Sequence, residues 1–418
     1  MSNANLISRK QYSHTLKNGL TIVAEEIPHA ESAAATLLVP IGSTCDPEGY
    51  AGITNMMVDM FSRGAGQWNS QELSAEFENL GIEHSESSGM ELAVFSGALL
   101  SENLAKLFSL MATMILEPHF DSAELENAKA LALQELLSLE DEPSSKVMVR
   151  LNEKFYPAPY GRLSRGTEAG IKAITSEALK THHRKMFSPH GAVLGVSGKF
   201  DFPAVCAAIE KAFSAWTGDK QVINAPALAT NSQVFHLPKD TNQLQIAFAS
   251  PSVKANDPEY YAARVGVGIL SGGMHGRLFI EVREKRGLVY RVSANHSSTS
   301  KHAGIFAYAG TTNKHAEETF AVMLKEMRGL STNITEDEVK RSKADLKSRL
   351  VMQSDLSSAR ASQLAHDWWI LGRLRTVTEV ASEIDKVNLQ MVMNYASHYP
   401  VSPITLVTLG SVELSLPN

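Results

Sequence analysis

Several residue patterns are scarce or absent in this chain of 418 residues. Its only two cysteines, Cys45 and Cys206, stand in no metal or redox spacing, which excludes a disulfide framework and leaves both as small apolar residues. No apolar run approaches the roughly 18 residues that a membrane-spanning helix needs. The net charge is −6 with both signs interspersed, which argues against a nucleic-acid partner because such a partner requires a clustered basic surface.

Histidine pairs of the kind that bind zinc on a helix are also absent. None of the 14 histidines has another histidine three or four residues further along the chain. His182 and His183 are adjacent, would point in different directions on a helix, and precede two basic residues. We therefore expect them at the surface rather than at a metal.

The chain start gives an expectation about compartment. Residues 1–8 contain no charged segment followed by an apolar one, so no signal peptide is predicted. Hydrophobic residues make up 44% of the chain and charged residues 20%, which is typical of soluble globular proteins. The expected location is cytoplasmic, or periplasmic if the sequence is a mature or truncated chain.

What the sequence does contain is an internal repeat. Three landmarks recur with a constant displacement of 211 residues (257 − 46). They are Asp46-Pro47-Glu48 and Asp257-Pro258-Glu259, Gly161-Arg162-Leu163 and Gly372-Arg373-Leu374, and Phe187-Ser188-Pro189 and His398-Tyr399-Pro400. We predict two copies of one fold, because the length is also too great for one ordinary core. The predicted domains are residues 1–216 and 233–418, joined by a linker over residues 217–232 that lacks periodicity.

Each copy mixes strands with blocks of helices. The predicted strands are residues 19–25, 33–40 and 192–198 in the first copy, and 243–250, 288–293 and 404–410 in the second. The predicted helices include residues 50–62 and 122–139, and their counterparts 259–270 and 336–352. This arrangement predicts an α+β fold of two homologous domains, each a mostly antiparallel β-sheet with helices packed on one face.

Motifs spread over nearly the whole chain resemble one known family. They are Lys17-Asn18-Gly19-Leu20-Thr21, Gly42-Ser43, Tyr156-Pro157-Ala158-Pro159-Tyr160-Gly161-Arg162, Gly166-Thr167-Glu168, Ser271-Gly272-Gly273, and the run from Arg277-Leu278-Phe279 to Tyr290. Together they resemble the pitrilysin/insulinase family of zinc peptidases, the inverzincins, in its short two-domain form. The resemblance implies two domains arranged as a clam-like half chamber.

The resemblance also locates a metal motif that this chain does not keep. The family carries H-x-x-E-H on the helix over residues 50–62, where two histidines bind zinc and the glutamate is the general base. Here those positions are Asn55, Val58 and Asp59, and the family's third ligand corresponds to Glu135. An amide binds zinc poorly and valine accepts no proton. We therefore expect a degenerate metal site, with no metal in this chain, or a weak non-zinc cation at most.

A second site is predicted in the second copy. Arg283 ends a charged helical run and Tyr290 follows on a strand, so the two side chains can converge on one point. In the family that this chain resembles, such an arginine and tyrosine bind the peptide and stabilise its tetrahedral intermediate. The family also pairs substrate with an edge strand that corresponds to residues 81–88. This chain has Ser85-Glu86 where the family usually has Asn-Ala, which puts that pairing in doubt.

These features lead to one function and leave two alternatives open. We expect an inactive chain that becomes part of a metalloendopeptidase as the non-zinc subunit of a heterodimer. Arg283 and Tyr290 would then act in trans on an unfolded peptide, and zinc would lie in a homologous partner subunit. One alternative is an inactive scaffold subunit of a larger complex, like the core proteins of respiratory complexes. The other is a self-sufficient peptidase with an atypical metal.

Overall fold

The computed structural model describes residues 9–417, which fall into two compact units. Unit 1 comprises Met1–Leu136, Arg162–Asn224 and Gln353–Arg375, and unit 2 comprises Leu137–Gly161, Ala225–Met352 and Thr376–Asn418. Each unit thus takes a segment from the other half of the chain, and the predicted boundaries around residues 217–232 stay a prediction. The segment over which no signal peptide was predicted, residues 1–8, lies outside the described residues. Across residues 9–417, no helix is long and apolar enough to cross a membrane.

Unit 1 is built on a six-stranded sheet with the order β1-β2-β8-β3-β7-β6. Its strands are β1 (Lys10–Thr15), β2 (Thr21–Glu26), β3 (Ser32–Val39), β6 (Glu83–Ser88), β7 (Ala93–Leu100) and β8 (Val193–Gly198). All neighbours are antiparallel except β2 and β8, which run parallel. The strand predicted over residues 81–88 is therefore an edge strand, β6.

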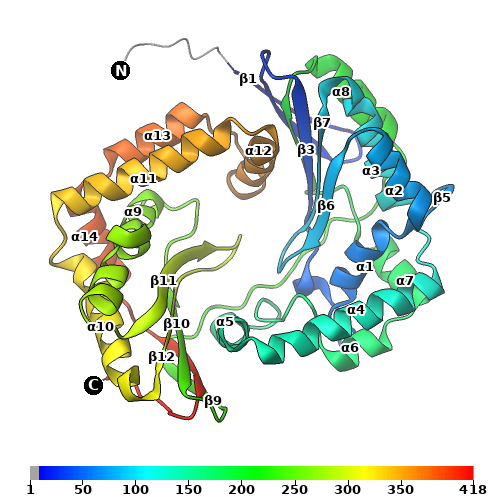
Figure 1. Cartoon of the computed structure of the whole chain (residues 1–418). Coiled ribbons are helices and arrows are strands. Elements are labelled where there is room, and N and C mark those ends of the chain that lie inside the picture. The colour runs from blue at the N-terminus through cyan, green and yellow to red at the C-terminus, as the bar shows by residue number, and fades with distance from the viewer. Residues whose placement is uncertain (1–8, 418) are drawn as a thin grey trace. The chain divides into compact units, whose positions relative to one another are not determined.

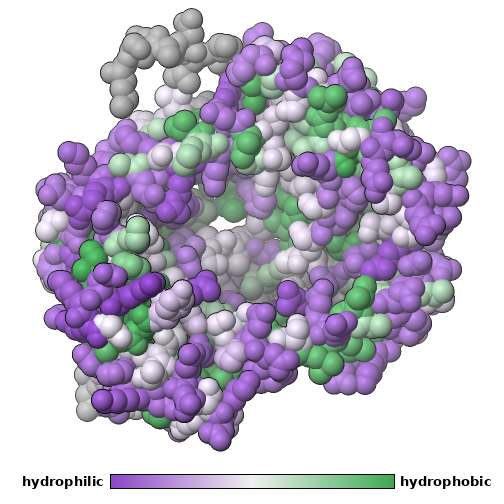
Figure 2. Space-filling view, viewed as in Figure 1, coloured by the Kyte–Doolittle hydropathy of each residue, from purple (hydrophilic) through white to green (hydrophobic). Residues whose placement is uncertain are grey.

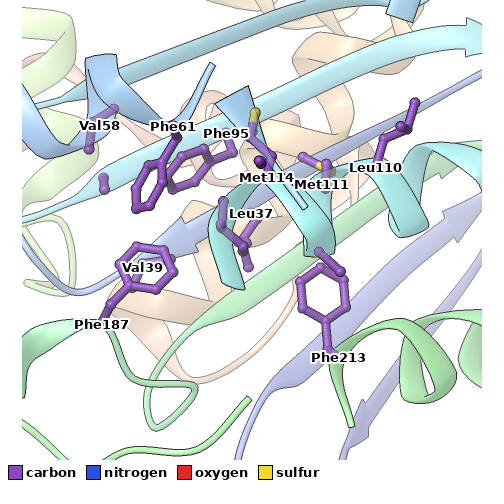
Figure 3. Packing of buried hydrophobic residues seen from close by; sticks show 14 of the residues in the cluster. Leu37, Val39, Val58, Phe61, Phe95, Leu110, Met111, Met114, Phe187 and Phe213 are labelled. Carbon is purple, nitrogen blue, oxygen red and sulfur yellow. The ribbon is translucent and has the colours of Figure 1, made fainter. Parts of the chain in front are cut away.

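One face of this sheet carries the main core of unit 1. The helices α1 (Ile53–Phe61), α3 (Leu104–Leu116) and α8 (Phe202–Phe213) supply apolar side chains to it. Figure 3 shows Phe61 of α1 beside Phe95 of β7, and their ring centroids are 5.5 Å apart. The remaining elements of the unit are β4 (Gly64–Ala65), β5 (Trp68–Asn69), α2 (Ser70–Asn79), α6 (Glu168–Ala173), α7 (Ser176–Met186) and most of α4 (Ser122–Asp141).

The opposite face of the same sheet is covered by α12 (Ser357–Leu371), which comes from the second half of the sequence (Figure 1). A Cβ atom at Gly195 on β8 would lie 2.2 Å from the carbonyl oxygen of Ala361, so only glycine permits this approach. Arg360, which is 0% exposed, forms two hydrogen bonds with Glu25 of β2, at 2.5 and 2.9 Å. The helix is thus fixed by close backbone packing and by a buried ion pair.

Unit 2 repeats this plan with a five-stranded sheet in the order β11-β12-β10-β13-β9. Its strands are β9 (Gln233–Pro238), β10 (Gln243–Pro251), β11 (Val289–Ser298), β12 (Ala303–Thr312) and β13 (Thr405–Gly410). Its core is supplied by α9 (Tyr260–Ser271), α10 (Ala316–Arg328) and α14 (Leu389–His398), and α11 (Glu336–Ser354) and α13 (Val377–Lys386) complete the unit. A helix from the first half of the sequence, α5 (Pro143–Phe155), packs on β10 and β13.

The two sheets correspond strand by strand, which confirms the predicted α+β class and its two homologous domains. The series β2-β8-β3-β7-β6 matches β9-β13-β10-β12-β11, and in each the first pair is parallel and the others are antiparallel. What the sequence did not indicate is the exchange of α5 and α12 onto the second face of each sheet. Helix periodicity identifies an apolar stripe but does not say which sheet will bury it.

The first predicted helix begins later than residue 50. The carboxylate of Asp46 accepts hydrogen bonds from the backbone N–H groups of Gly52, at 2.6 Å, and Thr54, at 3.1 Å. Gly52 adopts a φ of 97°, so the chain turns there and α1 starts at Ile53. Asp46 therefore caps this helix from outside it.

Candidate functional site

The degenerate metal motif lies on α1, where its three positions differ in exposure. Val58 is buried, at 2% exposure, and the side chain of Asp59 is 45% exposed. The side-chain oxygen of Asn55 accepts a hydrogen bond of 3.0 Å from the hydroxyl of Ser88 on β6. The same helix buries Met56, Met57 and Met60. Position 58 thus belongs to the core, and only positions 55 and 59 present polar atoms.

An arginine that the sequence analysis did not single out occupies this region. The Nε atom of Arg63 donates to Oδ2 of Asp59 at 2.8 Å, and its Nη1 lies 3.6 Å from Oε2 of Glu124. The i,i+4 spacing of Asp59 and Arg63 was the available signal, because such pairs meet on a helix surface. A guanidinium therefore supplies the positive charge next to Asp59.

These residues border a pocket of about 250 Å³ between α1, β6 and α4. Glu135 lines it from α4 together with Leu131 and Ala132, but its side chain is 62% exposed and lies 3.7 Å from Nε of Arg165. In the part of the chain that the structure describes, no group of three or more His, Cys, Asp or Glu side chains is placed to hold a metal ion. The donors present do not fit zinc, because one is an amide, the carboxylates of Asp59 and Glu135 each form an ion pair with an arginine, and no imidazole is among them.

Strand β6 forms one wall of this pocket through Glu86 and Ser87. Glu86 is engaged with His84, whose Nδ1 lies 2.7 Å from its Oε1, and the His84 ring stacks on Phe77. The hydrogen bond to Glu86 raises the pKa of His84 above its usual value, although partial burial opposes this. The two residues thus form an internal ion pair on the edge strand.

The expectation that His182 and His183 are surface residues is wrong for His182, and His183 is half-buried. His182 is 6% exposed, and its Nε2 lies 3.0 Å from the hydroxyl of Thr54 on α1. Burial lowers the pKa of His182 to about 4, so its imidazole is neutral. His183 stacks on Phe187 and hydrogen-bonds to the carbonyl of Ile115 at 2.8 Å. Both histidines support the core beneath α1. The neighbouring residues in the sequence did not indicate this, because they do not show which side of the helix is buried.

In unit 2 the structure places Arg283 beside Tyr290. Nη1 of Arg283 donates to the carbonyl oxygen of Tyr290 at 2.9 Å, and its guanidinium carbon lies 5.0 Å from the centre of the Tyr290 ring. The same carbon is 5.0 Å from the ring of Phe279, so the guanidinium contacts two aromatic rings. Phe279 belongs to the stretch that resembles the family, but the sequence did not predict its contact with Arg283.

The local backbone explains how Tyr290 is presented. Residues Phe279–Glu284 form a π-helical segment, and Gly287, with a φ of 62°, lets the chain turn into β11. The register of β11 against β12 shifts between Val289 and Arg291, so Tyr290 is the extra residue of a β-bulge. A bulge re-aims the side chain it carries, and Tyr290 is 85% exposed.

The charge around this pair is unevenly neutralised. Lys285 and Arg286 both hydrogen-bond to Glu281, which holds the pKa of that carboxyl below its usual value. Arg283 forms no ion pair with any of the described residues. On the face drawn in Figure 2, hydrophilic residues predominate and hydrophobic ones form several separate groups. Tyr290 is distinguished by its position beside an arginine that has no carboxylate partner among the described residues.

Two family descriptions match the sequence. Residues 21–168 match "Insulinase (Peptidase family M16)", and residues 173–346 match "Peptidase M16 inactive domain". The chain is 25% identical over 404 residues to an uncharacterized zinc protease of Rickettsia bellii, covering 96% of this chain and 97% of that protein. It is 23% identical over 425 residues to the mitochondrial-processing peptidase subunit beta of Neurospora crassa, covering 97% of this chain and 88% of that protein.

The fold of the chain also resembles that of a solved structure. The crystal structure of a peptidase M16 inactive domain from Pseudomonas fluorescens superposes with a TM-score of 0.89 at 20% identity, covering 98% of this chain and 99% of that chain. The two matched regions follow each other along the chain and include both the degenerate motif and the Arg283–Tyr290 pair. This protein therefore belongs to the insulinase family of peptidases, family M16.

Proposed function

We propose that this chain is the zinc-less subunit of a heterodimeric metallopeptidase. In this proposal Arg283 and Tyr290 bind the peptide and stabilise its oxyanion in the active site of a homologous, zinc-bearing partner. The observation that carries the proposal is the exposed Tyr290 beside an arginine without a carboxylate partner among the described residues, in a chain whose α1 lacks the family's ligands and base.

The chemistry of the pair supports a role at a developing negative charge. A guanidinium has five N–H donors, and the contact with the Tyr290 carbonyl uses one of those of Arg283. The other donors are oriented by the rings of Phe279 and Tyr290 and can bind a peptide carbonyl. The Tyr290 hydroxyl can donate a hydrogen bond to an oxyanion, a contribution that grows as the charge develops.

The absence of a general base from the motif positions on α1 supports catalysis in trans. Val58 cannot accept a proton, and the Asp59 carboxylate is already paired with Arg63. The name of the Neurospora relative describes a subunit of a processing peptidase, which supports an assembly of more than one chain. Zinc and its base would then be supplied by the partner.

The test starts from the partner. Co-purification from the native host should yield a homologue that carries H-x-x-E-H and zinc, and the reconstituted pair should cleave unfolded peptides. Tyr290→Phe and Arg283→Ala should each lower kcat by roughly 100- to 1000-fold, because one oxyanion donor is lost in each. An unchanged kcat in both variants contradicts the proposed role.

A matched control exists in the same unit. Nη1 of Arg264 donates to the hydroxyl of Tyr260 at 2.8 Å on α9, so this is a second arginine–tyrosine contact. Tyr260→Phe and Arg264→Ala should leave kcat within about 3-fold, since surface substitutions away from a site are usually nearly neutral. Zinc content of the complex and its apparent mass should stay the same in all four variants.

An inactive scaffold subunit is the second candidate. It is favoured by the hydrogen bond that Arg283 already makes to the Tyr290 carbonyl, which gives the arginine a structural use. In this case the co-purified assembly should contain no zinc-bearing homologue, and Arg283→Ala should change the thermal stability of the chain without affecting proteolysis.

A further inference from the structure

Unit 1 contains a second pocket, of about 330 Å³, at the end of the sheet where β2 and β8 begin. Its walls are Trp368 and Trp369 from the last turn of α12, His190, and Lys220 with Gln221 from the segment after α8. We call it the indole pocket. None of the degenerate metal positions lies in it, and neither does Arg283 or Tyr290.

The indole pocket is rich in hydrogen-bond donors and contains no carboxylate. No aspartate or glutamate lines it. Within residues 9–417, the ammonium of Lys220, the ring nitrogens of His190 and the indole N–H groups of Trp368 and Trp369 have no hydrogen-bond or ion-pair partner. Buried polar side-chain atoms without a partner are Ser197 Oγ, His302 Nε2 and Asn313 Oδ1, so the donors of the pocket are not sealed in the core. They are available to an acceptor that enters from outside.

The aromatic wall of the pocket is rigid. Trp368 and Trp369 pack against the buried cluster that α12 forms with β2, β3 and β8. The Trp368 carbonyl accepts a hydrogen bond of 2.8 Å from Gly372, which ends the helix in a left-handed conformation. About two turns earlier on α12, the buried ion pair of Arg360 with Glu25 fixes the same helix to β2. Sites carried by such a helix hold their geometry better than sites carried by loops.

The polar wall is positioned by two further contacts. The Gln221 side chain donates to the carbonyl of Lys185 at 3.0 Å, which anchors the segment that carries Lys220. The His190 ring lies against Gly19, where a Cβ atom would be 2.4 Å from Nδ1. Gly19 has a φ of 95°, so glycine both permits the turn and makes room for the imidazole.

We propose that the indole pocket binds a ligand with a carboxylate at one end and an apolar or aromatic body. Lys220 holds the carboxylate, and Trp368 and Trp369 cover the body. The volume lies at the lower end of the range for small-molecule sites and accommodates one large side chain with its carboxylate. The carboxyl end of a peptide and a free aromatic acid share this chemistry. The proposal concerns binding alone and does not depend on the proposed function, because it uses different residues.

Isothermal titration of the full-length chain tests the proposal with three probes. They are acetyl-Gly-Gly-Phe with a free carboxylate, the same peptide as its C-terminal amide, and N-acetylphenylalanine. The free acid should bind saturably at one site, and the amide should bind at least about 10-fold more weakly, because it lacks the charge that Lys220 neutralises. Binding of the acid should weaken as salt is added. Equal binding of acid and amide, or no saturable binding of either acid at millimolar concentration, overturns the proposal.

Variants locate the binding and distinguish the two ligand sources. Lys220→Gln should weaken acid binding by about 10- to 100-fold, and Trp369→Phe should weaken it several-fold. Lys180→Gln removes another exposed lysine of unit 1 and should change nothing. If the tripeptide acid binds more tightly than N-acetylphenylalanine, the pocket recognises the carboxyl end of a peptide. If the two bind equally, the pocket recognises a free aromatic acid. If the Lys220→Gln variant binds the acid as tightly as the unsubstituted chain does, the proposal is overturned.

Discussion

The charges beside the corresponding edge strands of the two units, β6 and β11, differ in whether they are paired. Beside β6, Arg63 is neutralised by Asp59 on α1, and on the strand itself His84 pairs with Glu86. Beside β11, Arg283 contacts a backbone carbonyl and two aromatic rings and has no carboxylate partner among the described residues. The topology of the sheets is the same at both edges.

This difference determines how much charge each edge leaves available to a ligand. A side chain whose charge is already paired inside its own unit binds a ligand weakly, because the ligand must displace the existing ion-pair partner. A guanidinium held by rings and a carbonyl keeps both its orientation and its charge. The fold therefore provides the edge twice, and the side chains decide at which edge an arginine keeps its charge without a carboxylate partner among the described residues.

The largest expected effect concerns Arg360, which is fully buried and paired with Glu25. Arg360→Ala should lower the free energy of unfolding by about 3 kcal/mol, since it removes the main partner of the buried Glu25 carboxylate and leaves it only the amide of Gln11, at 2.8 Å, and Arg9, at 3.6 Å. Chemical denaturation followed by circular dichroism measures this loss. Arg283→Ala, by the same measurement, should cost less than about 1 kcal/mol because the side chain is only half-buried.

Acidification and a double variant separate the charge of Arg360 from its size. Burial alone would raise the pKa of Glu25, but the hydrogen bonds and charge of Arg360 outweigh it and keep the pKa below its usual value. The contribution of the pair is therefore present above the unfolded pKa of about 4.3 and is lost as the pH falls through the folded pKa. Glu25→Leu with Arg360→Met should recover most of the loss, and a double variant as unstable as Arg360→Ala contradicts the ion-pair account.

Asp59→Ala tests the neutralised arginine beside β6 and should have a smaller effect. The Asp59 side chain is 45% exposed, so breaking its pair with Arg63 should cost no more than about 1 kcal/mol. The loss should shrink in high salt, as thermal unfolding at two ionic strengths can show. A loss of several kcal/mol would mean that Arg63 has no other acceptor, against its 3.6 Å approach to Glu124.

The smallest effect concerns the ion pair on β6 itself. The pKa of His84 is raised by Glu86, so the pair stabilises the folded state fully below about pH 6.5 and loses that contribution as the pH rises through the folded pKa. Glu86→Gln should return the pKa of His84 toward its usual value with a stability change below about 1 kcal/mol. An NMR titration of the His84 ring measures the shift, and an unchanged pKa in Glu86→Gln would contradict the pairing.

Much of the fold was predictable because its signals are local. Strand alternation placed β10 and β13 nearly to the residue, and the constant displacement of the repeated landmarks predicted two related domains. The start of α1 was predicted too early, because the capping carboxylate of Asp46 lies outside the helix that it caps. The exchange of α5 and α12 could not be predicted, because hydrophobic periodicity and helix propensity do not specify which distant sheet a helix covers.

The candidate sites divide in the same way. Sequence alone identified Asn55, Val58 and Asp59 as unsuited to zinc, because ligand chemistry depends on residue type. It did not predict that Arg63 neutralises Asp59, and it misplaced His182 at the surface. Both facts depend on partners supplied by other elements or by the local geometry of a helix end. The indole pocket depends on α12 lying against a sheet that is distant in sequence, so no local motif could indicate it.

The sequence by itself determined that the chain is doubled, that its first copy lacks imidazole ligands and a base, and that Arg283 and Tyr290 are the pair to examine. These conclusions follow from the identity and spacing of residues. Only the tertiary structure decided which charges are neutralised, that Tyr290 is presented on a bulge, and that two helices change sheets. The physical reason is that neutralisation and burial are set by neighbours in space, and the neighbour that neutralises Arg360, Glu25, comes from the opposite half of the chain.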